Sequence, residues 1–448
     1  MLEGFQLRPY QSAHLAFHMA HDRTLNLSDP GTGKTPTACL YIQYLVKVCD
    51  AAVAFVMPKS LLKKNYDELL NFTSLNPNEI EIVDGTPKKR DEIYNKDGVN
   101  VFLMGFDCFA REWKKLPEKF NGVVVDEFHM GFKSNDSKRT QSFYLCMNKV
   151  KYFLGMTGTL IDGRLSSAYP AIRVINRRFY ASYAEFLRNH AVLDDFGNPV
   201  MWVNHGRLKR ILGSCAVKMS FAEAYKNSPK PIIIPEKCQM DKKHFALYKE
   251  FEETALLELE DEFLTDSGSG GVHQMRCRQI IEAPESVGIE NEGKFELGKD
   301  EVLRVHLEDA KNDGKPLLIF SCFVAEQERI KKICEDEFGF RVGLINGSVS
   351  GKKRAEIDEQ FKAGKLDIVI GSPETMAVGF NWEHVDTVIF VSIDYKDSNW
   401  RQAIQRADRG TRKYPLKVYR LFYEGAKVEY RLWDIVRNKI EDNKKVGW

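Results

Sequence analysis

Short apolar runs recur in the first part of the chain, and each is followed by a turn and a stretch with helical spacing. These runs are rich in Val, Ile and Phe and cover residues 51–58, 99–105, 122–127 and 152–158. Near-continuous apolar content is typical of strands that are buried on both faces, as in a parallel sheet covered by helices. The first part of the chain is therefore predicted to form an α/β domain.

A second set of apolar runs follows in the last third of the chain, at residues 316–321, 341–347, 366–372, 386–392 and 416–422. A stretch with helical spacing, residues 351–364, lies between two of them. The same reasoning predicts a second α/β domain with parallel strands. The two halves are alike in predicted architecture and differ in sequence.

The middle of the chain, roughly 162–300, has more helical spacing and more aromatic residues. Pro229, Pro231 and Pro235 indicate a linker between domains, and the Gly/Ser-rich residues 265–274 indicate a loop that is poorly ordered without a partner. We predict an N-terminal domain over 1–230 with a helical extension, a C-terminal domain over 231–448, and a helical insertion around 240–300.

Composition narrows the class of protein without deciding its function. Apolar residues make up 43% of the 448 residues, and 65 Lys and Arg face 63 Asp and Glu, a net charge of +2. A nucleic-acid partner would therefore need a local basic surface. The nine cysteines form no C-x-x-C pair, and no apolar run has membrane-spanning length. We expect a cytoplasmic protein, monomeric or weakly oligomeric, with no membrane contact.

A glycine-rich segment, "LSDPGTGKTPTACLYIQYL" at residues 27–45, opens a predicted helix. Glycines allow a tight backbone path whose N–H groups face phosphate oxygens, and the helix N-terminus adds positive charge. Lys34 would reach the β- and γ-phosphates of ATP, and the Thr35 hydroxyl would bind Mg²⁺. The predicted phosphate-binding residues are Gly31, Thr32, Gly33, Lys34 and Thr35. Ser28 stands where the usual pattern has its first glycine.

Two carboxylates end the apolar strand of "VVVDEFH" at residues 123–129. Asp126 is placed to support the Mg²⁺ held by Thr35. Glu127 would orient and deprotonate the attacking water, because hydrolysis needs a base in line with the γ-phosphorus. An Asp-Glu pair after a strand is common, so its meaning depends on the phosphate-binding segment that precedes it.

Several motifs occur in the order found in superfamily-2 helicases: "LRPYQ", "DPGTGKT", "MPKSLLKKNYDE", "DEFH", "GMTGTL", "LLIFSCFVAEQERI", "ETMAVGFNW" and "QAIQRADRGTR". The chain resembles the Swi/Snf-like branch of this superfamily, and its small size resembles phage branch-migration helicases of the UvsW type. This resemblance implies two tandem RecA-like domains, ATP and Mg²⁺ as cofactors, and DNA as partner.

The resemblance also implies roles for single residues. Gln11 would read the adenine, and Gly379 would lie beside the nucleotide. Arg406 and Arg409, three apart on a helix that Gly410 could close, would face the γ-phosphate, with Arg401 and Arg412 left as solvated surface. Coupling of hydrolysis to movement falls to His129, Thr157, Gly158 and Thr159. Candidate nucleic-acid contacts are Lys59, Ser60, Lys88, Lys89 and Arg90.

The leading interpretation is an ATP-driven DNA helicase acting on forked or branched DNA in replication, recombination or repair. A duplex translocase that never separates strands and an RNA helicase are alternatives among enzymes. A nucleotide-switched clamp that does not hydrolyse ATP is the alternative that is not an enzyme. The residues that argue against it are the intact Lys34, Asp126, Glu127 and Arg409.

Overall fold

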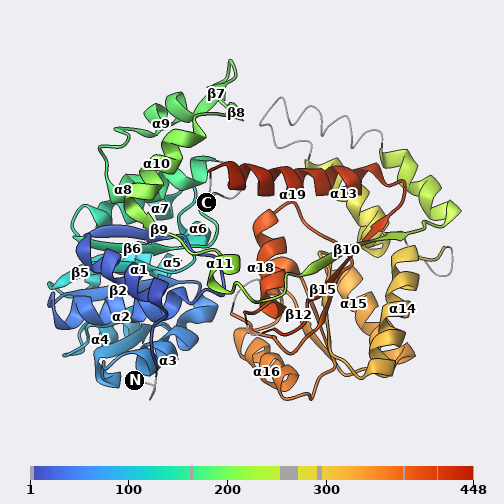
Figure 1. Cartoon of the computed structure of the whole chain (residues 1–448), viewed down its shortest axis with the longest axis horizontal. Helices are drawn as coiled ribbons and strands as arrows, with labels where there is room; N and C mark the ends of the chain where they lie inside the picture. Colours follow the sequence, from blue (N-terminus) through green and yellow to red (C-terminus); the bar gives the residue numbers. More distant parts are fainter. Residues whose placement is uncertain are drawn as a thin grey trace. The chain divides into compact units, whose positions relative to one another are not determined.

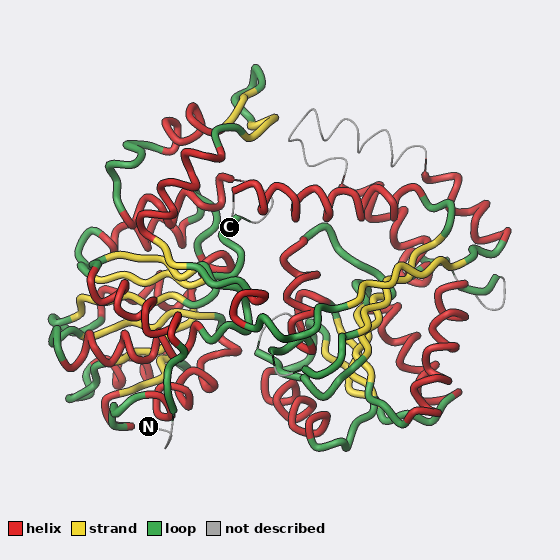
Figure 2. Tube along the Cα trace, in the orientation of Figure 1, coloured by secondary structure: helices red, strands yellow, loops and turns green. Residues whose placement is uncertain are grey.

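The computed structural model describes residues 5–161, 165–252, 271–289, 295–376, 379–410 and 412–446. The chain divides into two compact units, the first mainly up to Val192 with Met201–Lys226, the second mainly Asn227–Glu441 (Figure 1). In each unit a central layer of strands has helices on both sides (Figure 2). No helix in the described part of the chain is both long and apolar enough to cross a bilayer.

The first unit is built on a seven-stranded sheet with the order β3-β4-β2-β5-β6-β1-β9, in which every neighbouring pair is parallel. Its strands are β1 (Arg23–Asn26), β2 (Ala52–Met57), β3 (Ile80–Val83), β4 (Val101–Gly105), β5 (Phe120–Val125), β6 (Tyr152–Met156) and β9 (Ala216–Val217). A separate hairpin pairs β7 (Ala191–Leu193) with β8 (Pro199–Trp202).

Helices cover both faces of this sheet. The helices are α1 (Pro9–Ala20), α2 (Lys34–Lys47), α3 (Leu62–Phe72), α4 (Pro87–Tyr94), α5 (Phe106–Glu112), α6 (Phe128–Gly131), α7 (Lys138–Met147), α8 (Tyr169–Ile175), α9 (Tyr183–His190), α10 (His205–Cys215) and α11 (Phe221–Ala224). Ala52, Ala54 and Val56 share a buried cluster with Phe109 of α5 and Phe143 of α7. These are every second residue of β2, and the residues between them face the other side of the sheet, which helices also cover. The apolar run of β2 is therefore continuous.

The second unit has a six-stranded parallel sheet with the order β10-β15-β14-β11-β13-β12. The strands are β10 (Ile232–Cys238), β11 (Leu317–Phe320), β12 (Val342–Ile345), β13 (Ile368–Gly371), β14 (Thr387–Phe390) and β15 (Lys417–Tyr423). The helices are α13 (Gly271–Glu282), α14 (Gly298–Asp313), α15 (Val324–Lys332), α16 (Gly351–Lys362), α17 (Pro373–Met376), α18 (Asp397–Ala407) and α19 (Lys427–Val446). Two parallel, helix-covered sheets confirm the predicted tandem α/β fold.

Six strands lie where the sequence predicts none: β1, β3, β7, β8, β9 and β10. One of them, β10, corrects the predicted linker. Pro229 and Pro231 precede β10, and Pro235 lies within it. Because β10 is an edge strand that pairs only with β15, a proline there can leave its missing N–H on the open side. The central strand β1 is polar in sequence, yet Thr24 and Asn26 are buried, and Thr24 Oγ1 lies 2.8 Å from His18 Nδ1.

The helices from the predicted insertion are part of the second unit's core. Cys277 and Ile280 of α13 and Leu303 and Leu307 of α14 share one buried cluster with strand residues of the sheet. Residues 265–270 of the predicted Gly/Ser loop lie outside the described residues, and residues 271–274 are the first turn of α13. The region around 240–300 is therefore a structural element of the C-terminal unit where it is described.

A buried ion cluster joins α13, α14 and α19. Lys299, only 2% exposed, donates from Nζ to Glu282 Oε1 at 2.7 Å, to Glu429 Oε1 at 2.6 Å and to the Val391 carbonyl at 2.8 Å. Burial lowers the pKa of Lys299, but the two carboxylates outweigh burial and leave the pKa raised. Removing one partner of such a buried pair typically costs about 3–5 kcal/mol, so this cluster holds the three helices together.

Candidate active site

Three neighbouring strands of the first unit carry the predicted catalytic segments at one edge of the sheet. β6 pairs in parallel with β1 on one side and with β5 on the other. The glycine-rich segment follows β1, Thr157 follows β6, and Asp126 follows β5. Because carboxyl ends of parallel strands meet at the same edge, the three segments converge although they are up to 130 residues apart.

The glycine-rich segment has the backbone path that the sequence predicts. Gly31 and Gly33 both have φ of +81°, which a residue with a side chain rarely adopts. A Cβ on Gly33 would lie 2.3 Å from Gln11 Nε2, so position 33 has no room for one. The chain then enters α2 at Lys34, whose Nζ donates to the Ser28 carbonyl at 2.7 Å. The lysine thus spans the loop that would hold phosphate.

Ser28, which replaces the usual first glycine, has its own partner. Its buried Oγ accepts a hydrogen bond at 3.0 Å from the backbone N–H of Met219. Nearby, Asp29 Oδ2 accepts from the Phe221 N–H at 2.9 Å. The segment that follows β9 therefore fastens the first half of the loop, and a serine there supplies an acceptor that glycine lacks.

Gln11, predicted to read the adenine, lies against the loop. Its Nε2 donates to the carbonyls of Gly33 at 3.1 Å and Thr32 at 3.3 Å, and its Oε1 accepts from the Arg8 N–H at 2.8 Å. In this structure the amide of Gln11 holds the phosphate-binding backbone. Its contact with a base stays a prediction.

Two tyrosines that sequence reasoning missed also bind this loop. Tyr10 donates to the Thr32 carbonyl at 2.6 Å, and Tyr225 donates to the Gly31 carbonyl at 2.9 Å. The Arg8 guanidinium lies 4.4 Å from the centre of the Tyr225 ring. Tyr225 is 194 residues from Gly31 in sequence, so no local signal could have indicated it.

Glu127 occupies an uncommon backbone conformation at the start of α6, with φ of +48° and ψ of +52°. Its N–H donates to Asp126 Oδ1 at 3.0 Å. Its Oε2 is buried and makes no hydrogen bond within the described residues, although His129 Nδ1 lies 3.5 Å away. A left-handed, non-glycine residue with an unsatisfied carboxylate oxygen is typical of a functional position, and a water or polar ligand would satisfy that oxygen.

Asp126, the other carboxylate of the Asp-Glu pair, lies among charged side chains. Burial raises the pKa of Asp126, and the charge of Glu127 raises it further, while Lys34 opposes both effects. Glu68 of α3, which sequence reasoning missed, accepts a hydrogen bond from the Thr35 side chain and is close enough to Asp126 for their charges to interact. Thr35, Asp126 and Glu68 offer only oxygen donors, which fit the preference of Mg²⁺.

The predicted coupling residues contact both neighbours. His129 Nδ1 lies 2.8 Å from Thr157 Oγ1 and 3.5 Å from Glu127 Oε2, and Thr157 Oγ1 accepts from the Thr159 N–H at 3.0 Å. A Cβ on Gly158 would lie 2.5 Å from the Pro30 ring. The segment after β6 therefore contacts the general-base candidate through His129 and the phosphate loop through Gly158.

The second unit holds Arg406 and Arg409 in a way that corrects the sequence prediction. α18 ends at Ala407, because Asp408 turns to an extended conformation with ψ of 105°, so Arg409 is not on the helix face of Arg406. The two side chains meet at one acceptor instead. Arg406 Nη1 and Arg409 Nη2 donate to the Phe380 carbonyl at 3.2 and 3.1 Å, directly after Gly379 with φ of +93°.

Arg412 was expected on a solvated face, but its side chain is buried. Its side chain is 3% exposed, and it forms an ion pair with Asp386 at 2.5 Å. Its Nη1 donates to the carbonyls of Val385 at 2.8 Å and Ala407 at 3.2 Å. Arg412 therefore fastens the end of α18 to the entry of β14. Arg401 forms a partly buried ion pair with Asp397 at 3.2 Å.

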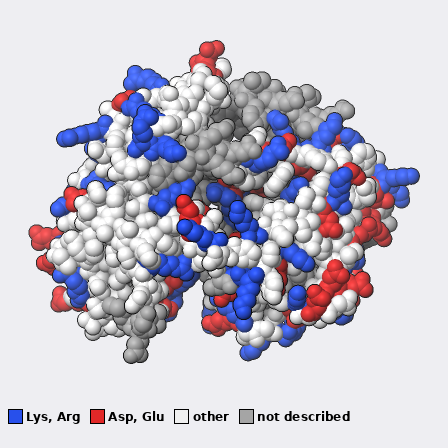
Figure 3. All heavy atoms as spheres, in the orientation of Figure 1, with Lys and Arg blue, Asp and Glu red and all other residues white. Residues whose placement is uncertain are grey.

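Of the candidate nucleic-acid contacts, four are exposed and one is not. Lys59 and Ser60 follow β2, and Lys88 and Lys89 follow β3, at the same edge as the catalytic segments. Arg90 is a correction, because its guanidinium is taken by Glu112 at 2.6 Å and by the Gly85 carbonyl at 2.5 Å. Both signs of charge lie on the visible surface of each unit, in keeping with the near-zero net charge (Figure 3).

Two family comparisons cover the units that carry these segments. Residues 4–162 match the family described as the res subunit of type III restriction enzyme, and residues 298–413 match the helicase conserved C-terminal domain. The first and second units are thus similar, in this order, to two domains of ATP-dependent helicases.

The curated relatives are much longer proteins. An uncharacterized ATP-dependent helicase of Mycoplasma pneumoniae is 24% identical over 92% of this chain and 39% of its own length. A chromodomain-helicase-DNA-binding protein 1-like protein of Danio rerio is 26% identical over 94% of this chain and 42% of its own length. This chain therefore spans about two fifths of these relatives. The solved SWI2/SNF2 ATPase core of Sulfolobus solfataricus in complex with dsDNA is 20% identical, with a TM-score of 0.45, covering 99% of this chain and 94% of that one.

We predict that Gly158→Ala weakens nucleotide binding. The new methyl group would overlap the Pro30 ring and force the phosphate loop to move. The expected result is at least a tenfold higher Kd for a fluorescent ATP analogue. Gly213→Ala in α10 is the matched control, because nothing lies within 4 Å of its added Cβ. Equal affinities for the two variants would show that the contact does not hold the loop.

Proposed function

We propose that this chain is a DNA-dependent ATPase that moves along DNA. The observation that carries the proposal is the convergence of a phosphate loop, an Asp-Glu pair and a threonine segment at one sheet edge, with His129 in contact with two of them. A clamp that only binds nucleotide would not need a buried, unsatisfied Glu127 oxygen beside that loop.

Each residue then has a defined task. The N–H groups of the glycine-rich loop and the Lys34 ammonium bind the phosphates of ATP. Glu127 accepts a proton from the attacking water. Thr35 and Asp126, with Glu68 beside them, would hold Mg²⁺, which neutralises charge on the phosphates when bound. Arg409 is proposed to stabilise the charge of the transition state.

The His129 contacts suggest how hydrolysis is coupled to movement. Thr157 and Thr159 respond to changes at Glu127 because His129 lies between the hydroxyl and the carboxylate. Loss of the γ-phosphate would change the charge next to Glu127, and this change would reach the segment after β6 through two contacts. The arrangement supports a motor more than a simple hydrolase.

Strand separation and duplex translocation are both supported as the output of this motor. The resemblance to phage branch-migration enzymes favours unwinding or branch migration of forked DNA. Several relatives are named as chromatin-remodelling proteins, which favours translocation on duplex DNA. We propose branch-directed unwinding as the leading function, with work in a bacterial or phage-infected cytoplasm remaining a prediction.

We predict that Glu127→Gln retains nucleotide binding and loses DNA-stimulated hydrolysis by about 10²–10⁴-fold, the usual contribution of a positioned base. ATP analogue titration and phosphate release would be measured on the same preparation.

Arg409→Ala is expected to lower kcat by a factor of about 10³ or more with little change in nucleotide affinity.

Lys413→Ala is the control for loss of positive charge, because Lys413 is exposed and four residues from Arg409. Arg412→Ala is unsuitable as that control, since its loss would release the end of α18. Ordinary turnover by Glu127→Gln would refute the general-base role, and equal turnover by the Arg409 and Lys413 variants would refute the arginine role.

A second prediction concerns DNA affinity. Replacing Lys59, Lys88 and Lys89 together by Ala should weaken DNA binding at every sequence. The slope of the logarithm of the binding constant against the logarithm of salt concentration should become shallower by about 1 for each lost phosphate contact. Fluorescence anisotropy at several salt concentrations would measure both. A control triple variant replaces Lys114, Lys119 and Lys149, which are exposed before β5 and β6 at the opposite sheet edge. Equal salt slopes would exclude this surface.

The choice between the two outputs rests on a strand-displacement assay. On forked DNA with ATP, we expect the wild-type protein to release the labelled strand and Glu127→Gln to release none. Displacement of a triplex-forming strand from blunt duplex, without release from forks, would show a duplex translocase instead. DNA-stimulated hydrolysis with neither output would refute the motor.

A further inference from the structure

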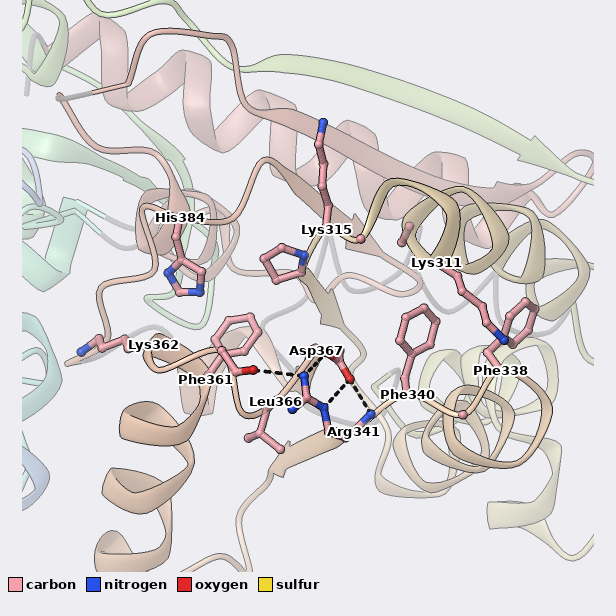
Figure 4. Close-up of a pocket in the computed structure, with 15 residues that line it drawn as sticks. Lys311, Lys315, Phe338, Phe340, Arg341, Phe361, Lys362, Leu366, Asp367 and His384 are labelled. Atoms are coloured by element: carbon pink, nitrogen blue, oxygen red, sulfur yellow. Dashed lines mark hydrogen bonds and ion pairs between the residues drawn. The ribbon is translucent and has the colours of Figure 1, made fainter.

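A cavity of about 510 Å³ lies at the edge of the second unit's sheet where its strands begin (Figure 4). Its lining residues come before β11, β12 and β13 and from the ends of α14 and α16. Arg406 and Arg409, which bind the Phe380 carbonyl, do not line it. The nearest link between the two is Trp382, whose ring lies 5.7 Å from the ring of Phe361 in the cavity wall.

The inner wall of the cavity is apolar and aromatic. Phe338 and Phe340 are half-buried, and their rings stack with centroids 6.2 Å apart and planes 19° apart. Phe361, 1% exposed, lies 4.9 Å from the His384 ring. Burial and the charge of Lys362 lower the pKa of His384, so its imidazole is neutral at neutral pH. Such a wall suits an inserted apolar side chain, and the volume is within the common range of about 300–1,000 Å³ for binding sites.

The outer lining is cationic, in contrast to the balanced charge of the whole chain. Lys311, Lys315, Lys362 and Arg341 line the cavity together with a single carboxylate, Asp367. Arg341 and Asp367 form an ion pair at 2.5 Å and largely neutralise each other (Figure 4). The three lysines supply the remaining charge.

These lysines are able to change partners. Lys362 pairs with Asp358 at 2.7 Å while 43% exposed, and Lys315 lies 3.7 Å from Asp313 with both side chains more than half exposed. Exposed pairs of this kind contribute about 0–1 kcal/mol. Within the described residues no carboxylate is in ion-pair distance of Lys311, which is exposed. A carboxylate arriving from outside therefore meets little competition.

Three glycines open the rim of the cavity. Gly314, Gly339 and Gly364 have φ of +63°, +72° and +67°, and nothing lies within 4 Å of a Cβ at any of them. Each comes at the end of a helical segment, where its N–H bonds back to a carbonyl of the last turn: Gly314 to Lys311, Gly339 to Glu335 and Gly364 to Phe361. With no side chain at these three positions, the aromatic wall stays open to an entering residue. An acidic peptide with an apolar anchor uses both this wall and the lysines.

We propose that this cavity is a docking site for an acidic segment of a partner protein. One or two aromatic or aliphatic side chains of that segment enter between Phe338, Phe340 and Leu366. Flanking Asp or Glu residues bind Lys311, Lys315 and Lys362. None of the lining residues is among those proposed for ATP hydrolysis.

The test uses the full chain and a fluorescein-labelled ten-residue peptide with a central Trp-Leu pair flanked by Asp and Glu. Fluorescence anisotropy should give saturable binding that weakens at least tenfold in the Lys311→Glu, Lys315→Glu double variant and in Phe340→Ala. The peptide with Asn and Gln in place of its acids should bind at least tenfold more weakly. Unchanged DNA-stimulated ATPase in the double variant shows that the protein remains folded.

Charge reversal at Lys331 and Lys332 of α15, outside the cavity lining, is the matched control and should leave peptide affinity unchanged. Absence of binding to wild type, or equal loss in the control variant, overturns the proposal. A labelled oligothymidylate is the competitor. If it displaces the peptide from wild type and binds the Lys311→Glu, Lys315→Glu variant more weakly than wild type, the cavity is a nucleic-acid surface and the proposal is overturned.

Discussion

The parallel pairing of β6 with both β1 and β5 is the constraint on which the candidate site depends. The register sets Asn26 beside Met156 and Val125 beside Gly155, so the segments after β1 and β5 leave the sheet one strand spacing to either side of the segment after β6. β6 lies between the strand that leads to the phosphate loop and the strand that leads to the Asp-Glu pair. Thr157 follows β6, so its hydroxyl is within reach of His129. A shift of one residue in this register would move every one of these side chains to the other face of the sheet.

In the second unit a backbone carbonyl, that of Phe380, positions the candidate catalytic arginines. Phe380 accepts hydrogen bonds from Arg406 and Arg409, and the Trp382 N–H donates back to the Arg406 carbonyl at 2.8 Å. These hydrogen bonds join the segment after Gly379 to the end of α18 and the turn that follows it. Arg412 extends this element to β14 through Val385 and Ala407. An arginine with a proposed catalytic task is thus positioned by contacts that have no chemical task of their own.

Cationic residues show how differently one residue type is used within a fold. Lys89 is exposed at the motif-bearing edge of the first sheet, and Lys59 makes only an exposed ion pair there with Asp84. Arg90, one residue after Lys89, is held by Glu112 in a largely buried pair. Lys299 is fully enclosed by carboxylates, whereas Lys311 is exposed beside an aromatic cavity. Burial and the nearest carboxylate decide between a structural and a binding role, because a guanidinium or ammonium that is already paired gains little from a phosphate.

The sequence by itself determined the α/β class, most strands, the phosphate loop and the Asp-Glu pair, because a continuous apolar run and a Gly-rich turn are local signals. It could not reveal β1, whose Thr24 and Asn26 are polar yet buried, or Tyr225 and Glu68, which reach the loop from distant elements. It placed Arg409 on a helix that ends at Ala407, and left Arg412 in solvent. Only the tertiary structure decided these points, since the end of a helix and the partner of a guanidinium are set by groups that the chain brings near after folding.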